Sequence, residues 1–333
     1  MEKDYLLTIA VPTYNGEKTI QNLLDLLLPQ CVNDIELLIS DNCSTDGTRD
    51  IIREYKKKYQ FIKYIRNEKN IGPDANFLQC MEKAQGHFIW LISDDDIVVE
   101  GAITQITRFL AANKNISLIY VTTRDFRGKY TGIENCSKHK PEVEVDIVTH
   151  SKKTFVKYAG YYWGFMSSFI CNSERFNKIK NPERYFGTYW LQSYIHALCA
   201  SGDSMIGIIK APCVGAGIYI NTSNFDSALV NGIYYKKMLN TMVQEAGFDR
   251  KQLDRLYIHR LLHLLRHDIV KEKASGKKRI NKKNLFKSTR NYPKAWLTVY
   301  PLMLIPNLIC RIAVESYREK LHIEGKIRVN RPE

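Results

Sequence analysis

The chain has 333 residues, of which 44% are apolar and 11% aromatic, and its formal net charge at pH 7 is +14. A chain of this length and composition can bury a full hydrophobic core, which excludes an intrinsically disordered protein and favours one large domain with an appended region. The first residues, MEKDYLLTIA, carry two acids before a short apolar run. We therefore expect a first strand here rather than a signal peptide, and a cytoplasmic protein.

The distribution of charge and the cysteines further restrict the classes of protein that fit this sequence. Residues 1–249 hold 28 Lys+Arg against 28 Asp+Glu, whereas residues 250–333 hold 21 against 7, so the excess lies in the last quarter. A local basic surface is typical of contact with nucleic acid or with an anionic membrane, and a solvated helical face is the plain alternative. The eight cysteines form no C-x-x-C pair, so we expect reduced thiols and neither a zinc knuckle nor a disulfide framework.

Up to about residue 124, apolar runs of strand length alternate with stretches of helical periodicity. Strands are predicted at residues 6–14, 35–42, 62–67, 88–93 and 117–123. Continuous apolar strands that alternate with helices are typical of a parallel sheet covered on both faces. The predicted class is therefore α/β, with a Rossmann-like, mostly parallel central sheet, and in such sheets ligands bind beyond the carboxyl ends of the strands.

Polar clusters follow the first four predicted strands. They are PTYNGE (12–17), SDNCSTDGT (40–48), RNEKNIGPDAN (66–76) and SDDD (93–96). Four polar loops on one rim indicate a binding site. Neither G-x-G-x-x-G nor G-x-x-x-x-G-K-[ST] is present, so the fingerprints of dinucleotide-binding and P-loop proteins are missing.

Beyond residue 124 the alternation ends. The expected elements are a polar connection over 125–150, a strand at 167–172, a helix over 186–200 that starts at Thr188, a pair of strands within 205–219 that turns near Pro212, and a helical pattern over 232–272. A basic stretch (271–284) and an apolar segment follow.

The SDDD cluster raises a question of charge. Asp94, Asp95 and Asp96 follow a strand that is built to be buried, and adjacent carboxylates repel one another. A hard divalent cation binds such oxygen ligands and would stabilise the negative charge on a departing diphosphate. The alternative is that these carboxylates lie at the positive end of a helix that begins near Glu100.

The other rim loops carry groups that suit a nucleotide. Asp41 can accept hydrogen bonds from a ribose or a base, and residues 13–15 offer donors and an aromatic face. Arg66 can pair with a phosphate or remain a surface charge. Residues 46–48 are typical of a turn before a helix, and Pro73 predicts the start of another helix.

Four motifs in this order resemble one known family. VPTYNGEKTI, ISDNCSTDGT, RNEKNIGPDANF and WLISDDD, within about 96 residues, resemble family 2 of the nucleotide-sugar glycosyltransferases, which have the A-type, Rossmann-like fold. The resemblance continues less tightly through SSFICNSERF and FGTYWLQSYIH to about residue 220. The N-x-G-P-D-x-N-F form is most similar to the abequosyltransferase branch, whose members add a dideoxy sugar during bacterial surface polysaccharide synthesis.

The resemblance implies roles for individual residues. The nucleotide-sugar contacts that it implies are Pro12, Thr13, Tyr14, Asn15, Asp41, Asn42, Arg66, Asn70, Asn76, Asp94 and Asp95. Among these, Asp41 would contact the base, and Asn70 and Asn76 the ribose and phosphates. The family's metal motif usually reads D-x-D-D, and Ser93 replaces its first Asp. Asp96 is then expected to be the principal ligand of Mg²⁺ or Mn²⁺, Asp94 an adjacent ligand and Asp95 a catalytic contact to sugar or metal.

The chain departs from the family on the acceptor side. Most members place an acidic pair that ends in the general base just before a helix, and this chain has Gly187 and Thr188 there. An inverting transfer needs a base for the acceptor hydroxyl. Gln192 and His196 follow Thr188 at steps of four, and His196 is either a proton acceptor or a satisfied helix histidine. Asp203 is the other nearby carboxylate, so the base and the stereochemical outcome stay open.

Two C-terminal patterns remain. His259, His263 and His267 recur at a spacing that could hold zinc, but no acid or fourth ligand stands beside them, which favours a solvated basic face. Residues 295–310 are 16 uncharged residues between Lys294 and Arg311. A spanning helix needs about 20 apolar residues, so we expect a segment in the membrane interface, the alternative being a core helix packed on the catalytic domain.

The function expected from these observations is a metal-assisted hexosyl- or deoxyhexosyltransferase that acts on a polyprenyl-diphosphate-linked glycan in O-antigen or capsule synthesis. We expect a catalytic domain over 1–225, with a nucleotide part (1–124) and an acceptor part (125–225), and a helical, basic, membrane-associating region over 226–333. The protein would be peripheral on the inner face of the cell membrane and bind no nucleic acid, and its oligomeric state is unknown. The alternatives are a sugar nucleotidyltransferase, a nucleic-acid-binding protein and an inactive nucleotide-sugar-binding protein.

Overall fold

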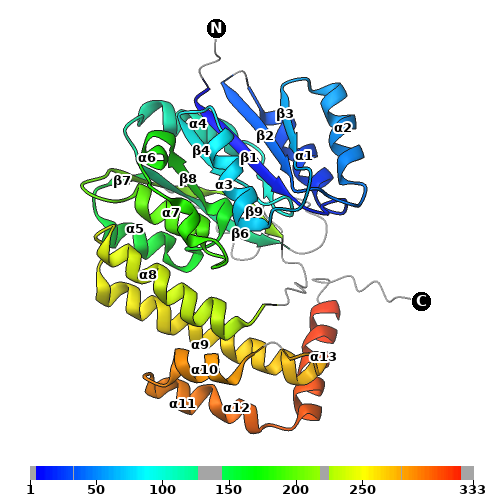
Figure 1. Ribbon diagram of the computed structural model, residues 1–333, viewed down its shortest axis with the longest axis vertical. Helices are drawn as coiled ribbons and strands as arrows, with labels where there is room; N and C mark the ends of the chain where they lie inside the picture. Colours follow the sequence, from blue (N-terminus) through cyan, green and yellow to red (C-terminus); the bar gives the residue numbers. More distant parts are fainter. Residues whose placement is uncertain (1–4, 33, 127–144, 218–224, 279, 324–333) are drawn as a thin grey trace. The chain divides into compact units, whose positions relative to one another are not determined.

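The computed structural model describes residues 5–32, 34–126, 145–217, 225–278 and 280–323 (Figure 1). Packing divides the chain into two compact units. The first, which we name the sheet unit, contains the described residues up to Gly217 and also Gln244–Phe248. The second, which we name the helical unit, contains the described residues from 225 to Val243 and from Asp249 onwards.

The sheet unit is organised around one nine-stranded sheet with the order β3-β2-β1-β4-β8-β6-β9-β5, and β7 pairs with β9 beside this path. Strand β1 pairs in parallel with β2 and β4, and β2 pairs in parallel with β3. Strand β8 is antiparallel to both β4 and β6. The strands are β1 (Leu7–Thr13), β2 (Ile35–Asp41), β3 (Ile62–Arg66), β4 (Phe88–Leu91), β5 (Ile97–Val98), β6 (Leu118–Phe126), β7 (Ile147–Thr149), β8 (Phe169–Asn172) and β9 (Ile206–Gly217). The six strands predicted up to residue 172 and the α/β class are confirmed.

The helices of the sheet unit pack apolar side chains into its core. In α1, Ile20, Leu23, Leu24 and Leu27 are buried in the same core as the apolar residues of β1 and β2. Pro73 is the first residue of α3, where its missing N–H costs no helical hydrogen bond. The helices are α1 (Ile20–Leu27), α2 (Thr48–Lys58), α3 (Pro73–Lys83), α4 (Ala102–Ala112), α5 (Lys152–Ala159), α6 (Ser173–Asn177) and α7 (Leu191–Cys199).

Two predictions about the later part of the sheet unit were wrong. Residues 206–217 form the single strand β9, not a pair of strands that turns at Pro212. The register against β6 shifts on both sides of Thr122, which faces Pro212, so a bulge accommodates the residue that lacks an N–H. Helix α7 begins at Leu191, and Thr188 lies in the loop before it. Most of the connection expected over 125–150 lies outside the described residues.

The helical unit is built on the long helix α9 (Arg250–Ser275), which buries Leu253, Tyr257, Leu261 and Leu265 along one side. The Asp249 side chain caps its first turn, and Gly276 ends it in the left-handed region at φ +70°. The helical pattern predicted over 232–272 is therefore divided between α8 and α9. The other helices are α8 (Tyr235–Gln244), α10 (Lys282–Thr289), α11 (Pro293–Thr298), α12 (Tyr300–Leu304) and α13 (Asn307–Ile323).

The uncharged segment 295–310 runs through α11, α12 and the start of α13. Within the described part of the chain, no single helix is long and apolar enough to cross a membrane, although Pro293–Leu304 and Asn307–Ser316 pass that test together with a bend of 99° between them. Ala295, Val299 and Cys310 are buried. The exposed large apolar side chains of α11, α12 and α13 are Trp296, Leu297, Leu304, Leu308, Ile309 and Ile312.

Candidate functional site

The four polar loops predicted at one rim meet at the carboxyl edge of the parallel strands. The register places Thr13 beside Asp41 and Asp41 beside Arg66, which are the last residues of β1, β2 and β3. Backbone hydrogen bonds continue past the strand ends, from Asn42 N to Thr13 O (2.9 Å) and from Asn67 N to Asp41 O (2.9 Å). The loops that begin at these residues are therefore neighbours.

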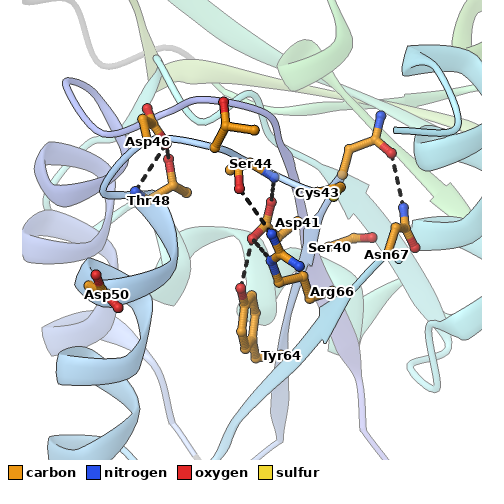
Figure 2. A network of polar contacts seen from close by, with 12 residues as sticks. Ser40, Asp41, Cys43, Ser44, Asp46, Thr48, Asp50, Tyr64, Arg66 and Asn67 are labelled. Carbon is orange, nitrogen blue, oxygen red and sulfur yellow. Dashed lines mark hydrogen bonds and ion pairs between the residues drawn. The ribbon is translucent and has the colours of Figure 1, made fainter. Parts of the chain in front are cut away.

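Asp41 is fully buried at the centre of this edge (Figure 2). One carboxylate oxygen accepts a hydrogen bond from Ser44 N (2.8 Å), and the other accepts one from the Tyr64 hydroxyl (2.7 Å) and lies 3.3 Å from Arg66 Nε. Burial raises the pKa of Tyr64, and the hydrogen bond to Asp41 raises it further. Arg66 is still partly exposed and also donates to Ser44 O.

This placement differs from the one expected for a residue that reads a nucleobase. No part of the Asp41 side chain is exposed, so a base could reach it only after Arg66 or Ser44 moved. In this structure Asp41 holds Arg66 and the 42–46 loop in place.

Asn42, Asn70 and Asn76 have unequal positions in the site. Asn42 is buried and bonds the loop after β3, donating to Asn70 Oδ1 (2.9 Å) and accepting from Ile71 N (2.9 Å). Asn76 is also buried, and its amide bonds the Ser40 carbonyl (3.0 Å) and hydroxyl (2.7 Å). Asn70 is exposed at the rim. Of the three, Asn70 can meet a ligand directly, while the other two fix the loop.

The loop after β1 presents Tyr14 and Asn15 to solvent, whereas Pro12 is buried within the strand. Asn15 has a positive φ of 55° and is tied to the loop after β2, with its N–H donating to Ser44 Oγ (2.9 Å) and its Oδ1 accepting from Thr45 N (2.8 Å). Tyr14 is 48% exposed, so its ring is free to stack on a flat ligand.

The first acid of the SDDD cluster lies against this same loop. The Thr13 hydroxyl donates to Asp94 Oδ2. A Cβ placed on Gly16 would stand 2.3 Å from the same oxygen, so only glycine leaves room for the carboxylate. Burial, with a contribution from the Asp95 charge, raises the pKa of Asp94 to about 7, although the Thr13 hydrogen bond lowers it.

Asp95 and Asp96 connect the cluster to the other half of the sheet. Asp96 is 2% exposed, and its two oxygens accept from Ser167 Oγ (2.6 Å) and Gly217 N (3.1 Å). Burial, with the Asp95 charge, raises the pKa of Asp96 well above its usual value. Asp95 accepts from Ser93 Oγ (2.5 Å) and is partly exposed. The residue expected to be the principal metal ligand is thus the most enclosed of the three.

The acids fit a divalent cation by their chemistry but do not form a preassembled cage. Among the described residues, no group of three or more His, Cys, Asp or Glu side chains converges on a common point that could hold a metal. Mg²⁺ is commonly held by one or two carboxylates and completed by substrate phosphates, so a site shared with a diphosphate needs no such group. The helix does begin near Glu100, at Ala102, but β5 (Ile97–Val98) separates the three acids from its first turn.

The two helix residues expected near the acceptor are enclosed. Gln192 and His196 both lie in α7 with 6% and 2% of their surface exposed. The His196 ring packs 5.1 Å from the Phe169 ring, and burial lowers its pKa to about 3. A side chain with 2% of its surface exposed offers little for an acceptor to contact, and its lowered pKa makes it a weak base. The structure therefore supports the alternative of a buried helix histidine, and gives no support to catalysis by His196.

Asp74 is a carboxylate that the sequence interpretation did not single out. It lies in the first turn of α3, is 7% exposed, and accepts a hydrogen bond from Gly187 N (2.7 Å). Burial raises its pKa. It thus brings a carboxylate to the Gly187–Thr188 loop, where the acidic pair of the family is missing. Its motif was visible as the D of G-P-D, but a contact over 113 positions has no local signal.

Comparison with known proteins gives one family and several relatives. Residues 8–182 match the sequence profile described as "Glycosyl transferase family 2". The abequosyltransferase RfbV of Salmonella typhimurium is 29% identical over 205 residues, which are 57% of this chain and 60% of the relative. The GalNAc(5)-diNAcBac-PP-undecaprenol beta-1,3-glucosyltransferase of Campylobacter jejuni is 26% identical over 203 residues, which are 56% and 59%. The match thus spans less than two thirds of either relative.

The fold has counterparts among solved structures. Staphylococcus aureus TarS 1-349 in complex with UDP-GlcNAc superposes with a TM-score of 0.59 at 14% identity, covering 97% of this chain and 93% of that one. At this identity the likeness concerns the fold alone. It agrees with the predicted A-type, Rossmann-like architecture.

Removing the His196 titration should make the protein less sensitive to acid. An unfolded chain binds a proton at this position below about pH 6.5, whereas the folded chain resists until about 3, so the stabilisation is complete above pH 6.5 and is lost as the pH falls towards 3. We expect the unfolding free energy, measured in urea at pH 7 and again near pH 5, to fall by about 2 kcal/mol more in the native chain than in His196→Gln. Equal losses in the two proteins would contradict this assignment.

Proposed function

The chain belongs to glycosyl transferase family 2, and from this premise we propose that it transfers a sugar from a nucleotide-sugar donor to a polyprenyl-diphosphate-linked glycan in the synthesis of a bacterial surface polysaccharide, O-antigen or capsule. The names of two relatives, an abequosyltransferase and a glucosyltransferase whose name includes PP-undecaprenol, support this class of reaction. The observation that carries the proposal is the contact of Asp94 with Thr13 and Gly16, because it joins the acidic cluster to the loop proposed for the nucleotide.

The donor would lie along the rim of the sheet. Tyr14, Asn15, Arg66 and Asn70 are at least partly exposed there and would contact the nucleotide directly. Asp41, Asn42 and Asn76 would act through them, since each is buried and hydrogen-bonded to a neighbouring loop. This division assigns the recognition of the donor to exposed loop groups and the rigidity of the loops to buried amides and carboxylates.

The acids would hold the leaving group. We propose Asp94 and Asp96 as ligands of Mg²⁺ or Mn²⁺ and Asp95 as the contact to the sugar. The bound cation supplies Lewis-acid stabilisation of the departing diphosphate. Ser167 Oγ and Gly217 N already orient Asp96, and Thr13 orients Asp94, so the chain fixes the direction of both carboxylates before a ligand arrives.

Deprotonation of the acceptor hydroxyl remains without an assigned residue. Asp74 holds the Gly187 backbone, and Phe186 and Tyr189 beside it are 40% and 50% exposed. These two rings offer apolar faces on which an acceptor sugar could stack. Tyr189 has a positive φ of 62°, a conformation that non-glycine residues rarely adopt outside functional turns.

The nucleotidyltransferase alternative is less well supported. A triphosphate substrate would need a glycine-rich, basic loop around its phosphates. The loop over residues 12–18 has one glycine, Gly16, and one basic residue, Lys18. An inactive nucleotide-sugar-binding protein would not hydrolyse a nucleotide sugar in the absence of acceptor, whereas a transferase would.

Removing one carboxylate of the acidic cluster should abolish turnover. We expect the full chain to hydrolyse or transfer at least one nucleotide sugar in Mn²⁺, and Asp96→Asn to reduce that rate by about 100-fold or more, because it removes a ligand of the cation. The donor is chosen by a thermal-shift panel of UDP, GDP, CDP and dTDP with and without Mn²⁺. Asp50→Asn, an exposed acid in α2, is the control and should keep full activity. If no donor is hydrolysed or bound, the proposal fails.

Filling the space beside Gly16 should weaken donor binding without unfolding the protein. Gly16→Ala places a methyl group against Asp94 Oδ2, and overpacking of this kind costs about 1–3 kcal/mol. We expect affinity for the nucleoside diphosphate with Mn²⁺, measured by titration calorimetry, to fall by about tenfold. Gly47→Ala is the matched control, since its methyl group meets the Glu17 side chain at 3.1 Å, an exposed group that can move. Equal affinities in both variants would show that Asp94 is not part of the donor site.

We propose that the helical unit places the enzyme on the inner face of the cell membrane, as a peripheral protein. Leu297, Leu304 and Leu308 are 77%, 86% and 64% exposed, and a solvated helix gains nothing from such side chains. Lys294 and Arg311 flank the segment and would meet anionic headgroups. Residues 226–333 would thus be the membrane-associating region, and residues 1–225 the catalytic domain.

Adding acids to this face should release the protein from vesicles. We expect Leu297→Glu with Leu308→Glu to reduce co-sedimentation with phosphatidylglycerol-containing vesicles by about tenfold, because charged groups stay in water. Val32→Glu, at a side chain in the sheet unit that is 56% exposed, makes the same change elsewhere and should have no effect. Unchanged sedimentation of the double variant would exclude this segment as the membrane contact.

A further inference from the structure

A pocket of about 710 Å³ lies in the helical unit, outside the rim described above. One wall is a stripe of α9 that includes Arg255, Leu262 and Arg266. Leu262 and Arg266 follow Arg255 by 7 and 11 residues, and this spacing puts all three on the same side of an α-helix. The other wall includes Tyr292, which precedes α11, and Lys294, in the first turn of that helix.

The charged groups of the pocket are all basic. None of the described residues that line it is acidic, and across the described parts of the helical unit no ion pair is formed by Arg255, Arg266 or Lys294. Arg266 is oriented by a hydrogen bond from its Nε to Leu262 O (3.0 Å), which leaves the two terminal nitrogens of its guanidinium for a ligand. Guanidinium groups bind phosphate oxygens in a two-pronged geometry that neither water nor a carboxamide reproduces.

The pocket also has an apolar part. Ile258, Leu262, Tyr292 and Pro293 contribute carbon surface to it. Trp296 and Leu297 of α11 follow directly, and they are 48% and 77% exposed. Cations beside an apolar floor suit a ligand that joins a polyanionic head to a hydrocarbon chain. Nucleic acid would use the cations but leave this carbon surface without a partner.

We infer that this pocket binds the diphosphate and the first isoprene units of a polyprenyl-diphosphate carrier. The inference rests on the proposed function, and it assigns a binding site to the lipid end of the acceptor. A glycosylated polyprenyl diphosphate carries two negative charges next to a chain of apolar isoprene units. A phospholipid phosphodiester carries one, so three unpaired cations match the diphosphate better. Arg255, Arg266 and Lys294 contact the two phosphates, and Leu262 and Tyr292 contact the chain.

The ligand series that tests this uses the full chain and short soluble probes. We expect geranylgeranyl diphosphate, in titration calorimetry below its micelle concentration, to bind about tenfold more tightly than inorganic diphosphate or geranylgeraniol. That result requires both halves of the pocket. Equal binding of inorganic diphosphate would overturn the inference, because the apolar part would then contribute nothing. Equal competition by phosphatidylglycerol vesicles would also overturn it, since the site would then be a general headgroup site.

A charge-matched pair of variants locates the binding. Arg255→Glu with Arg266→Glu should weaken geranylgeranyl diphosphate binding by about tenfold or more. Lys277→Glu with Lys278→Glu changes the net charge by the same amount in the exposed loop after α9, and should leave binding almost unchanged. Similar losses in both would show that only total charge matters and would overturn the inference. The melting temperature of each variant checks its fold.

The failure of this inference can be told apart from a failure of the proposed function. Donor binding by the native chain is measured in the same preparation with the nucleoside diphosphate and Mn²⁺. If the donor binds and geranylgeranyl diphosphate does not, only the pocket assignment is wrong. If neither binds, the proposed function is wrong as well.

Discussion

The structure depends on the burial of carboxylates at the carboxyl edge of its parallel sheet. Burying a charge without compensation is costly, so each buried acid needs a cation, a set of hydrogen-bond donors or a proton. Asp41 has the first two, because Arg66, Tyr64 and Ser44 surround it. Asp94 and Asp96 have hydrogen-bond donors but, among the described residues, no ion pair with a basic side chain, and the pKa of each is raised. The same edge therefore holds one compensated acid and two that an external cation would stabilise.

The strands and the rim could be predicted from the sequence because both have local signals. A run such as Phe88–Leu91 is continuously apolar and ends in acids, and parallel strands align their carboxyl ends whatever the details of the loops. The position of Pro73 predicts the start of α3 in the same way. The four family motifs occur in the order of these strands, and together with the strand pattern they predicted the fold.

The errors have physical reasons that lie outside any local pattern. Pro212 is typical of a turn, but a bulge against β6 keeps β9 continuous, and that depends on a strand 90 residues earlier in the chain. The burial of Asp41, Asn42 and Asn76 likewise comes from hydrogen bonds between distant segments, which the motifs that contain these residues do not reveal. Helical spacing placed His196 on a face with Thr188, yet α7 starts later and is buried nearly all round. The Asp74 contact with Gly187 joins segments that no motif relates.

The uneven charge of the chain follows from the different tasks proposed for its two units. In the sheet unit, Asp94 and Asp96 lie where a cation and a diphosphate would meet, and Arg66 is paired with a different acid, Asp41. In the described part of the helical unit, Arg255, Arg266 and Lys294 form no ion pair with an acid and lie beside carbon surface. The donor and the lipid carrier both present a diphosphate, but one is a leaving group and the other must stay intact. Binding the first through a cation between carboxylates of the sheet unit and the second through arginines of the helical unit would assign the two diphosphates to different sites, and the cation would stabilise the charge on the departing one. An arginine pocket holds its anion by hydrogen bonds and charge, and so would anchor the carrier.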